Sequence, residues 1–572
     1  MTELAIDRVG TAPGAPNRLR GSIGVHALGL ALVLIALVPL LGRSAQFSAD
    51  EGAAMAQARL LSEDRGWALD HPLPVLDPTN EAFPLEFADP VDRADGGPAA
   101  APFAKHPSYA VLLAFADRWG GTTGMVLTSV LGTLLAALLA ALLASRFEPD
   151  LGPPTLWVTG LATPLFVDGW VVIAHTLGAA LVAGAVLAVL GVHRRQAAGP
   201  LLWVVVTMAG AVLLRNEAVL MGVALVVATA GLAWHTRRWL TGAAAGAVLV
   251  GTVLGREVDG WLSAGVTGGI AHGGSAGVGG AGFVAGRLSS AFITLLMPSY
   301  GSLGVDDIVT LVAVVSLVAV VAIARRRPDD RAGICLFVGL AMVAAVARAA
   351  MTPEVTPGLL VAAPVLTAGL AALTLVVRQD AERRWLASTV ALFAAAVLAT
   401  QYATGGSGEW GGRYFAIALP LIVPLLVIGL REVLTGLDHS TRRLVGAALV
   451  VSGLAFAVAG ARSLVKTEDA TEELAVEVQV ARERLDDPVV VATGGAAARF
   501  SWREVLAGQE WLLVTSDDLP RWLERLGDAG REVVLATRTP EQDRGSLAGW
   551  TTLSDEQVRR GSTWTVITLR EG

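Results

Sequence analysis

Residues 122–144, TTGMVLTSVLGTLLAALLAALLA, form an apolar run without a single charged side chain. About 20 such residues in a helix cross the roughly 30 Å hydrocarbon core of a bilayer. Similar runs recur along the 572 residues, of which 53% are hydrophobic and 16% charged, and the mean hydropathy is +0.59. Because a helix satisfies its backbone hydrogen bonds internally, each run predicts a transmembrane helix. The chain is therefore expected to be an all-α polytopic membrane protein.

Thirteen runs predict thirteen transmembrane helices. They cover residues 22–42, 122–144, 153–167, 173–191, 200–214, 218–234, 239–255, 306–324, 332–350, 358–377, 385–400, 413–430 and 444–461. The first run lacks a small-residue cleavage site, so we expect it to remain as an uncleaved helix.

Arginine is concentrated in every second connection between these runs, and basic connections stay in the cytoplasm. The residues concerned are Arg18, Arg20, Arg146, Arg194, Arg195, Arg237, Arg238, Arg325–Arg327, Arg383, Arg384, Arg442 and Arg443. With a cytoplasmic N-terminus, an odd number of spans places the C-terminus outside the cell membrane.

The spans divide the chain into three parts. Residues 1–21 are expected to form a cytoplasmic N-terminal segment, and residues 22–462 a transmembrane domain. That domain carries two long extracytoplasmic loops, at residues 43–121 and 256–305. Residues 463–572 are expected to form a small soluble extracytoplasmic domain. Function is expected in these three extracytoplasmic segments.

The tail has the pattern of an α/β domain. PVVVATGG and REVVLATRT predict strands, and DDLPRWLERLGDAG predicts an amphipathic helix that ends at glycine. No phosphate-loop, metal-cluster or nucleophile motif occurs in the tail, so an accessory or binding role is expected.

The two long loops have contrasting patterns. The first ends in KHPSYAVLLAFADRWGG, whose apolar spacing up to Trp119 predicts an amphipathic helix lying in the membrane interface. The second contains SAGVTGGIAHGGSAGVGGAG, whose glycines disfavour helix and strand. That stretch is interpreted as a flexible connector or as a flap that orders when substrate binds.

Composition also excludes some classes of function. The net charge of -7 averages basic and acidic segments on opposite sides of the membrane, and nucleic-acid binding is not indicated. Cys335 is the only cysteine, so no intrachain disulfide can form and redox chemistry is not expected. No nucleotide-binding loop is found, and no nucleotide cofactor is expected.

Two adjacent acids, Asp50 and Glu51, follow the first predicted helix in FSADEGAAMAQARLL. A structural interpretation is helix capping, because Asp is a favoured N-cap residue and acids in a first turn suit the helix dipole. A functional interpretation is that a carboxylate at headgroup level accepts a hydroxyl proton while a sugar leaves a lipid phosphate. The base of inverting glycosidases has a similar task. The pair alone does not decide between these interpretations.

Four stretches, in order, resemble motifs of the C-type membrane glycosyltransferases, which include protein O-mannosyltransferases and lipid A aminoarabinose transferases. SADEGAAMAQARLL, followed by Gly66-Trp67, is similar to the family's Asp-Glu motif. Lys105-His106-Pro107 is similar to a Lys-Pro-Pro or His-Pro-Pro stretch before the second span, although Ser108 replaces a second proline. The stretches together cover most of the membrane region.

The third and fourth stretches lie within the later spans. LATPLFVDGWVVIAHTLGAAL places Pro164 and His175 on either side of a short outside turn. GEWGGRYFAIALP is similar to a Gly-Arg-Tyr element that opens a late span.

The resemblance implies a C-type glycosyltransferase fold and transfer, with inversion, of a sugar from a polyprenyl-phosphate donor. The acceptor would be an extracytoplasmic cell-envelope glycan, lipid or protein. Asp50 would be the general base with Glu51 beside it, although the choice between the two stays open, and together they could bind a divalent cation. Lys105 and Arg413 would contact the donor phosphate, and an arginine there could instead reach the lipid headgroups. The substrate-binding candidates are His106, His175 and Tyr414.

Two other classes of function stay open. A multi-span transporter or flippase predicts ionisable residues near the midplane and two repeated halves, and neither pattern is clear. A noncatalytic membrane protein would use its soluble tail to bind envelope components. Arg215 and Glu217, between two predicted spans, are expected to form a structural pair. Trp410 is interpreted as an interfacial aromatic residue or as a surface for stacking a sugar.

Overall fold

The computed structural model describes most of the chain. The described residues are 15–42, 46–79, 81–85, 100–102, 106–267, 283–300, 303–351, 354–373, 380–400, 410–494, 497–558 and 564–572. Lys105 and most of the glycine-rich stretch after residue 267 lie outside them.

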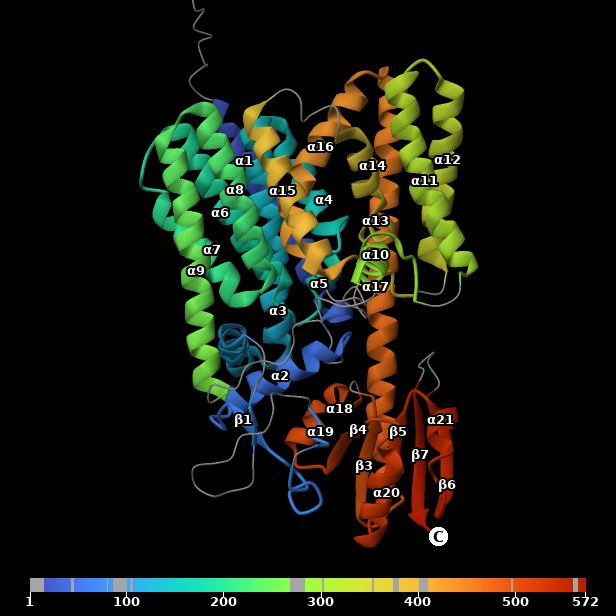
Figure 1. The fold of residues 1–572 in the computed structure, drawn as a ribbon. Helices are drawn as coiled ribbons and strands as arrows, with labels where there is room; N and C mark the ends of the chain where they lie inside the picture. Colours follow the sequence, from blue (N-terminus) through green and yellow to red (C-terminus); the bar gives the residue numbers. More distant parts are fainter. Residues whose placement is uncertain are drawn as a thin grey trace, which may run out of the picture.

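Helices dominate the described residues and gather into one elongated bundle (Figure 1). The bundle contains α1 (Ala15–Leu41), α3 (Pro107–Phe147), α4 (Gly152–Leu161), α5 (Leu165–Asp168), α6 (His175–Arg195), α7 (Leu201–Leu214), α8 (Glu217–Thr236), α9 (Trp239–Thr267), α10 (Phe283–Leu296), α11 (Val305–Arg326), α12 (Arg331–Ala350), α13 (Leu359–Ala362), α14 (Pro364–Leu373), α15 (Ala381–Thr400), α16 (Leu419–Thr435) and α17 (His439–Arg482). Short 3-10 helices, η1 (Pro149–Leu151) and η2 (Arg413–Ala418), precede α4 and α16.

Each of the thirteen predicted spans overlaps a helix of this bundle. Within the described residues, nine helices are long and apolar enough to cross a membrane. Other predicted spans are shorter or broken: Thr163-Pro164 separates α4 from α5, and Pro364 begins α14 directly after α13. Proline cannot donate a helical hydrogen bond, which explains breaks at these positions.

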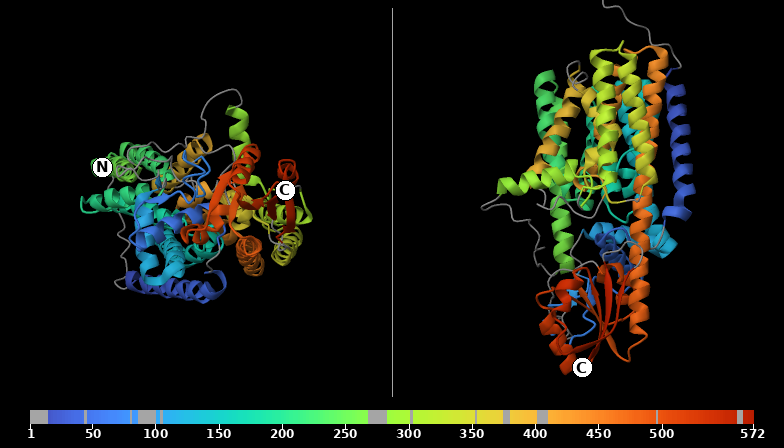
Figure 2. Two further views of the ribbon diagram at one scale, coloured as in Figure 1. Left: turned by 90° about the horizontal axis from the view of Figure 1, so that it is seen from below. Right: turned by 90° about the vertical axis from the view of Figure 1, so that its right-hand side faces the viewer.

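Two helices continue beyond the predicted spans. α9 extends past residue 255 to Thr267, so SAGVT, the beginning of the glycine-rich stretch, is helical, contrary to the prediction from its composition. α17 extends past residue 461 to Arg482 and runs from the bundle to the C-terminal sheet (Figure 2). The C-terminal sheet is thus joined to the bundle by a continuous helix.

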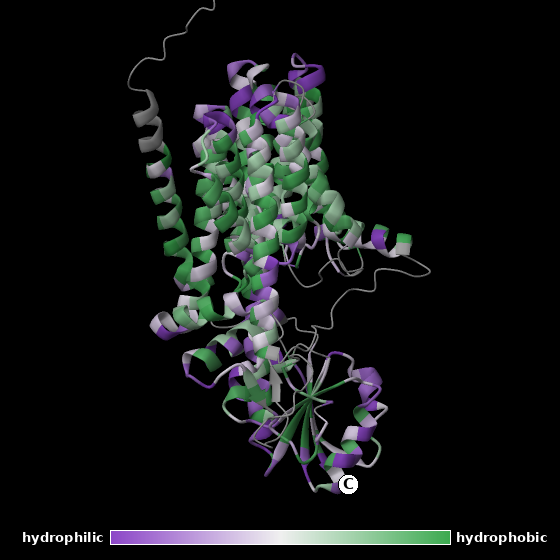
Figure 3. Cartoon of the chain, turned by 60° about the vertical axis from the view of Figure 1, so that its left-hand side comes forward, coloured by the Kyte–Doolittle hydropathy of each residue, from purple (hydrophilic) through white to green (hydrophobic). Residues whose placement is uncertain are grey.

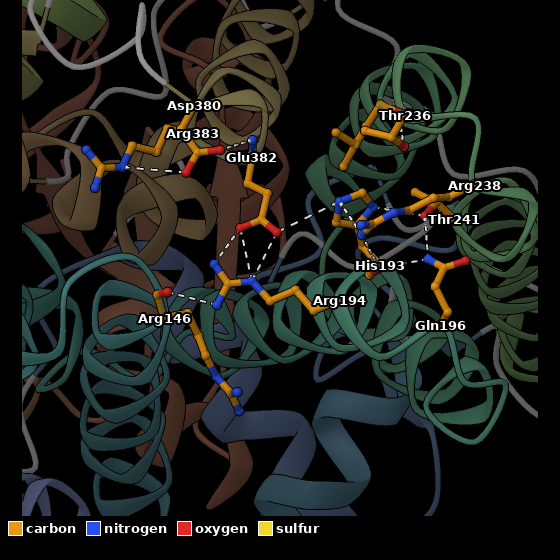
Figure 4. A network of polar contacts seen from close by, with 11 residues as sticks. Arg146, His193, Arg194, Gln196, Thr236, Arg238, Thr241, Asp380, Glu382 and Arg383 are labelled. Carbon is orange, nitrogen blue, oxygen red and sulfur yellow. Dashed lines mark hydrogen bonds and ion pairs between the residues drawn. The ribbon is translucent and has the colours of Figure 1, made fainter. Parts of the chain in front are cut away.

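Hydrophilic residues gather at the end of the bundle away from the sheet, whereas hydrophobic residues dominate along its length (Figure 3). At the end away from the sheet, arginines of the predicted cytoplasmic connections form a polar network (Figure 4). Arg194 donates from Nε to both Glu382 carboxylate oxygens at 3.0 Å and from Nη1 to the Arg146 carbonyl at 2.8 Å. Arg238 donates to the His193 carbonyl at 2.9 Å. We call this the basic end, and the opposite end the domain end.

At the domain end, α3 begins with the predicted amphipathic helix. The positive φ of 57° at Gly121 breaks α3, and the part before the break lies across the bundle axis (Figure 1). Val111, Phe115 and Trp119 are exposed on it. An apolar face exposed on a crosswise helix at the end of an apolar bundle agrees with the predicted interfacial position.

The C-terminal sheet has five strands: β3 (Pro488–Thr493), β4 (Trp511–Val514), β5 (Glu532–Thr537), β6 (Trp550–Gln557) and β7 (Thr565–Glu571). Their order is β4-β3-β5-β7-β6, with the first three parallel and the last two antiparallel to their neighbours. β3 and β5 are buried almost throughout, as expected for parallel strands covered on both faces. Four helices accompany the strands: α18 (Ala497–Phe500), α19 (Trp502–Leu506), α20 (Leu519–Asp528) and α21 (Pro540–Arg544). The predicted strands and amphipathic helix are confirmed.

The first long loop packs against this sheet. It contains α2 (Ala49–Ser62) and an antiparallel pair, β1 (Ala68–Asp70) and β2 (Ala100–Pro102). The Leu513 amide of β4 donates to the Ala82 carbonyl at 2.9 Å, and Leu73 and Ala82 join the sheet's hydrophobic core. Segments far apart in the sequence therefore meet at the domain end.

Candidate active site

Glu51 is a structural residue at the start of α2. Its Oε2 accepts hydrogen bonds from the Phe47 and Ser48 amides at 2.7 and 2.8 Å, and its Oε1 accepts one from the Val172 amide at 2.7 Å. The side chain is 2% exposed. Ser48 is the N-cap residue and Glu51 satisfies the amides at the helix start. The capping interpretation therefore fits Glu51, whereas the N-cap is not Asp50.

Asp50 has a different environment from its neighbour. Its Oδ2 lies 2.7 Å from Arg413 Nη2, and its Oδ1 lies 3.7 Å from Arg499 Nη1. The Asp50 side chain is 25% exposed. The predicted site residues Asp50 and Arg413 thus meet, across much of the sequence, at the domain end. One acid in the pair supports the backbone, and the other faces two guanidinium groups.

Two consecutive glycines place Arg413 next to Asp50. Gly411 and Gly412 have φ values of 70° and 72°, in the left-handed region that favours glycine. A Cβ at position 411 would lie 2.3 Å from Pro164 Cγ, and their amides donate to the carbonyls of Thr356 and Pro357. The third and fourth motif stretches therefore pack together, and their contact fixes the start of η2.

Arg499 comes from α18 of the C-terminal domain and was not predicted as a site residue. α18 follows β3 and lies between the sheet and α2 (Figure 1). A Cβ at position 52 would lie 1.9 Å from the Arg499 carbonyl oxygen, so only glycine allows this approach of the two backbones. Burial lowers the pKa of Arg499, and the nearby Asp50 carboxylate opposes that shift. AAARF carries no motif that could have identified this arginine from sequence.

The other predicted substrate-binding residues lie in different environments. His106 Nδ1 lies 3.0 Å from Asp259 Oδ1, on the part of α9 beyond the predicted span. His175 is buried at the first residue of α6. Tyr414 is buried, with the Arg413 guanidinium 5.8 Å from its ring centre. The substrate roles of these three residues stay a prediction.

A cavity of about 750 Å³ lies beside His106, between the start of α3 and the end of α9. Its lining is largely apolar and includes Trp67, Pro107, Val111, Trp261 and Val266. An apolar lining at the domain end of the bundle suits a lipid chain better than a free sugar.

Arg215 and Glu217 form the predicted pair between two spans. Arg215 donates to Glu217 from Nε at 3.0 Å and from Nη2 at 2.6 Å. Trp410 is 3% exposed and packs against Gly460 of α17, which corrects both predicted roles for it. An aromatic side chain buried among helices can neither lie in a headgroup belt nor stack on a sugar.

Metal binding finds no further support in the geometry. In the part of the chain that the structure describes, no three His, Cys, Asp or Glu side chains group to hold a metal ion. Both Glu51 oxygens already accept backbone hydrogen bonds, which makes Glu51 a poor ligand for a cation.

The fold and the site together define a polytopic α-helical integral membrane protein. Its C-terminal α/β domain packs against α2 at the domain end. No protein-family model matches the chain, and no curated protein matches it in sequence. Among solved structures, the chain is similar to the crystal structure of ArnT from Cupriavidus metallidurans in the apo state. The TM-score is 0.44 at 16% identity, covering 95% of this chain and 98% of that chain. The function proposed below rests on this chain's own residues.

Proposed function

We propose that the protein is a membrane glycosyltransferase that moves a sugar from a polyprenyl-phosphate donor to an extracytoplasmic acceptor. The observation that carries the proposal is the Asp50–Arg413 pair, with Oδ2 and Nη2 2.7 Å apart at the domain end of the bundle. A carboxylate for the acceptor proton and a guanidinium for the phosphate are the two groups that such a transfer needs.

Asp50, rather than Glu51, is the general base in this proposal. Both Glu51 oxygens accept backbone hydrogen bonds, and the side chain is buried. Asp50 is partly open, and its partners are guanidinium groups, which also bind phosphate. When the donor phosphate binds Arg413, the Asp50 carboxylate is released to take the proton of the attacking hydroxyl. The hydroxyl oxygen then bonds to the anomeric carbon from the face opposite the phosphate, which leaves with the bonding electron pair.

The membrane setting supports a lipid-linked donor. The site lies at the domain end of an apolar bundle, and the same end carries a crosswise helix with an exposed apolar face and the apolar cavity beside His106. A polyprenyl chain would hold the sugar phosphate at this level, without a nucleotide site. We place the domain end outside the cytoplasm because arginines collect at the basic end. Lys105, which precedes His106, is proposed as a further contact of the phosphate.

Substitution of Asp50 by asparagine tests the proposal. Removal of one general base slows catalysis by about 10²–10⁴-fold, so transfer of labelled sugar from a polyprenyl-phosphate donor should fall by that factor. Fluorescence-detected size exclusion in detergent should show unchanged amounts of folded protein, because Asp50 does not cap α2. Undiminished transfer by Asp50→Asn would rule out this base. A gene deletion that altered solute uptake and left every envelope glycan and glycoprotein unchanged would favour a transporter.

A further inference from the structure

The C-terminal domain is packed onto the site rather than suspended beside it. One hydrophobic cluster contains Leu34 of α1, Met55 of α2 and Leu113 of α3 together with Val490 of β3 and Trp502 of α19. These side chains are 2% exposed or less. Close packing in such a core gives the domain a defined position relative to α2.

The domain's parallel strands direct their carboxyl ends toward the bundle. α18 follows β3 at that edge and contacts α2, whereas β7, which is antiparallel, carries the C-terminus away from the bundle (Figure 1). Loops at the carboxyl ends of parallel strands are the usual position of binding residues in open α/β sheets. In this chain α18, the first helix after β3, carries Arg499.

Arg413 and Arg499 contact different oxygens of the same carboxylate. Arg413 of the bundle contacts Asp50 Oδ2, and Arg499 of the domain lies near Oδ1. The three side chains are 14–25% exposed, so an anion can reach them from outside. A phosphate also presents two or more equivalent oxygens, and guanidinium groups bind it with the geometry they use for a carboxylate.

We propose that Arg499 is a second phosphate-binding residue, so that the bundle and the C-terminal domain each supply one guanidinium group to the phosphate of the lipid-linked substrate. This inference rests on the proposed function. The phosphate takes the position beside both arginines that Asp50 now occupies. The C-terminal domain is then part of the active site, and donor binding joins it to the bundle.

Binding of two lipids to the full-length protein in detergent tests this role. The probes are a polyprenyl monophosphate and the polyprenol of the same chain length, which differ only in the phosphate. Wild type should bind the phosphate more tightly than the alcohol. A hydrogen bond to a charged group contributes enough to change affinity about tenfold or more, so Arg499→Ala and Arg413→Ala should each weaken phosphate binding by that factor. Binding of the polyprenol should not change.

Arg503→Ala is the matched control in the same domain. Arg503 donates to Thr122 Oγ1 at 2.9 Å, across the contact between α19 and α3, without reaching Asp50. This variant should bind the phosphate as wild type does. An equal loss in Arg503→Ala would assign the effect to domain docking and overturn a direct role for Arg499.

The remaining outcomes separate the two proposals. If Arg413→Ala loses phosphate binding and Arg499→Ala keeps it, the inference about Arg499 is wrong and the proposed function stands. If wild type does not prefer the phosphate to the polyprenol, both are wrong. Should Arg499→Ala fail to fold, Arg499→Gln keeps a polar side chain without the charge, and retained phosphate binding by it would overturn the inference equally.

Discussion

Gly52→Ala tests whether the close approach of α18 to α2 is required. The added Cβ would lie 1.9 Å from the Arg499 carbonyl oxygen and 2.7 Å from its carbonyl carbon. Carbon–oxygen contacts between unbonded groups begin at about 3.3 Å, so the two backbones must separate by about 1.4 Å. Neither partner atom belongs to a side chain that could rotate away. The substitution therefore moves α18 or detaches it.

Two opposing free energies, helix propensity and overpacking, decide how much Gly52→Ala changes the stability of the contact between α18 and α2. Alanine in a helix is more stable than glycine by about 1 kcal/mol, whereas overpacking typically costs about 1–3 kcal/mol. The added Cβ and the Arg499 carbonyl oxygen are both fixed to their backbones, so we expect an overpacking cost of about 3 kcal/mol and a net loss of about 2 kcal/mol in the stability of the contact between α18 and α2. Arg499, already 3.7 Å from Asp50, would move out of ion-pair distance.

Three measurements follow the consequences of Gly52→Ala. Limited proteolysis should cut near α18 and α19 faster than in wild type, while thermal unfolding of the bundle should change little. Phosphate binding should fall as in Arg499→Ala. Gly339→Ala in α12 is the control, because nothing lies within 4 Å of its added Cβ and it should be neutral or slightly stabilising. Wild-type proteolysis and phosphate binding in Gly52→Ala would refute the packing argument.

Two further substitutions test Glu51 at the start of α2 and Asp77 in the loop that docks on β4. Glu51→Gln would turn an amide NH₂ toward backbone donors and leave at least one backbone amide without an acceptor, so the free energy of unfolding should fall by about 1–3 kcal/mol in thermal unfolding. Glu524→Gln, at an exposed position, is the control. Equal stability of both variants would contradict the capping role of Glu51. Burial alone would raise the pKa of Asp77, but hydrogen bonds from His71 and from the amides of Ala82 and Glu81 outweigh it and lower the pKa below 3.8. A carboxyl with a lowered pKa in the folded state stabilises above its unfolded pKa, and this contribution is lost as the pH falls through the folded value. The loop carrying Ala82 should therefore stay docked on β4 at neutral pH and loosen below about pH 3.8. Asp77→Asn should remove this loosening in acid. Loosening that begins near pH 6 would show that another group controls the docking of the loop.

The sequence alone determined the elements whose cause is local. Each apolar run must be surrounded by lipid or by other apolar helices, and a helix satisfies its backbone hydrogen bonds in such surroundings. All thirteen predicted spans therefore overlap helices. The strands and the amphipathic helix of the tail follow from the periodicity of adjacent residues, and Arg215 and Glu217 pair because they are neighbours across one turn. The ends of α9 and α17 were missed because a helix supported by tertiary contacts continues beyond its apolar run.

The tertiary structure decided which of two adjacent acids faces the site. Asp50 and Glu51 are equivalent in the sequence, and the difference arises because the Val172 amide packs against Glu51 while Arg413 and Arg499 approach Asp50. Those partners come from three distant segments. A sequence pattern reports the surroundings that a segment needs, but it does not report which distant segment supplies them. That depends on close backbone contacts, such as those at Gly52 and Gly411, which form only when the whole chain packs.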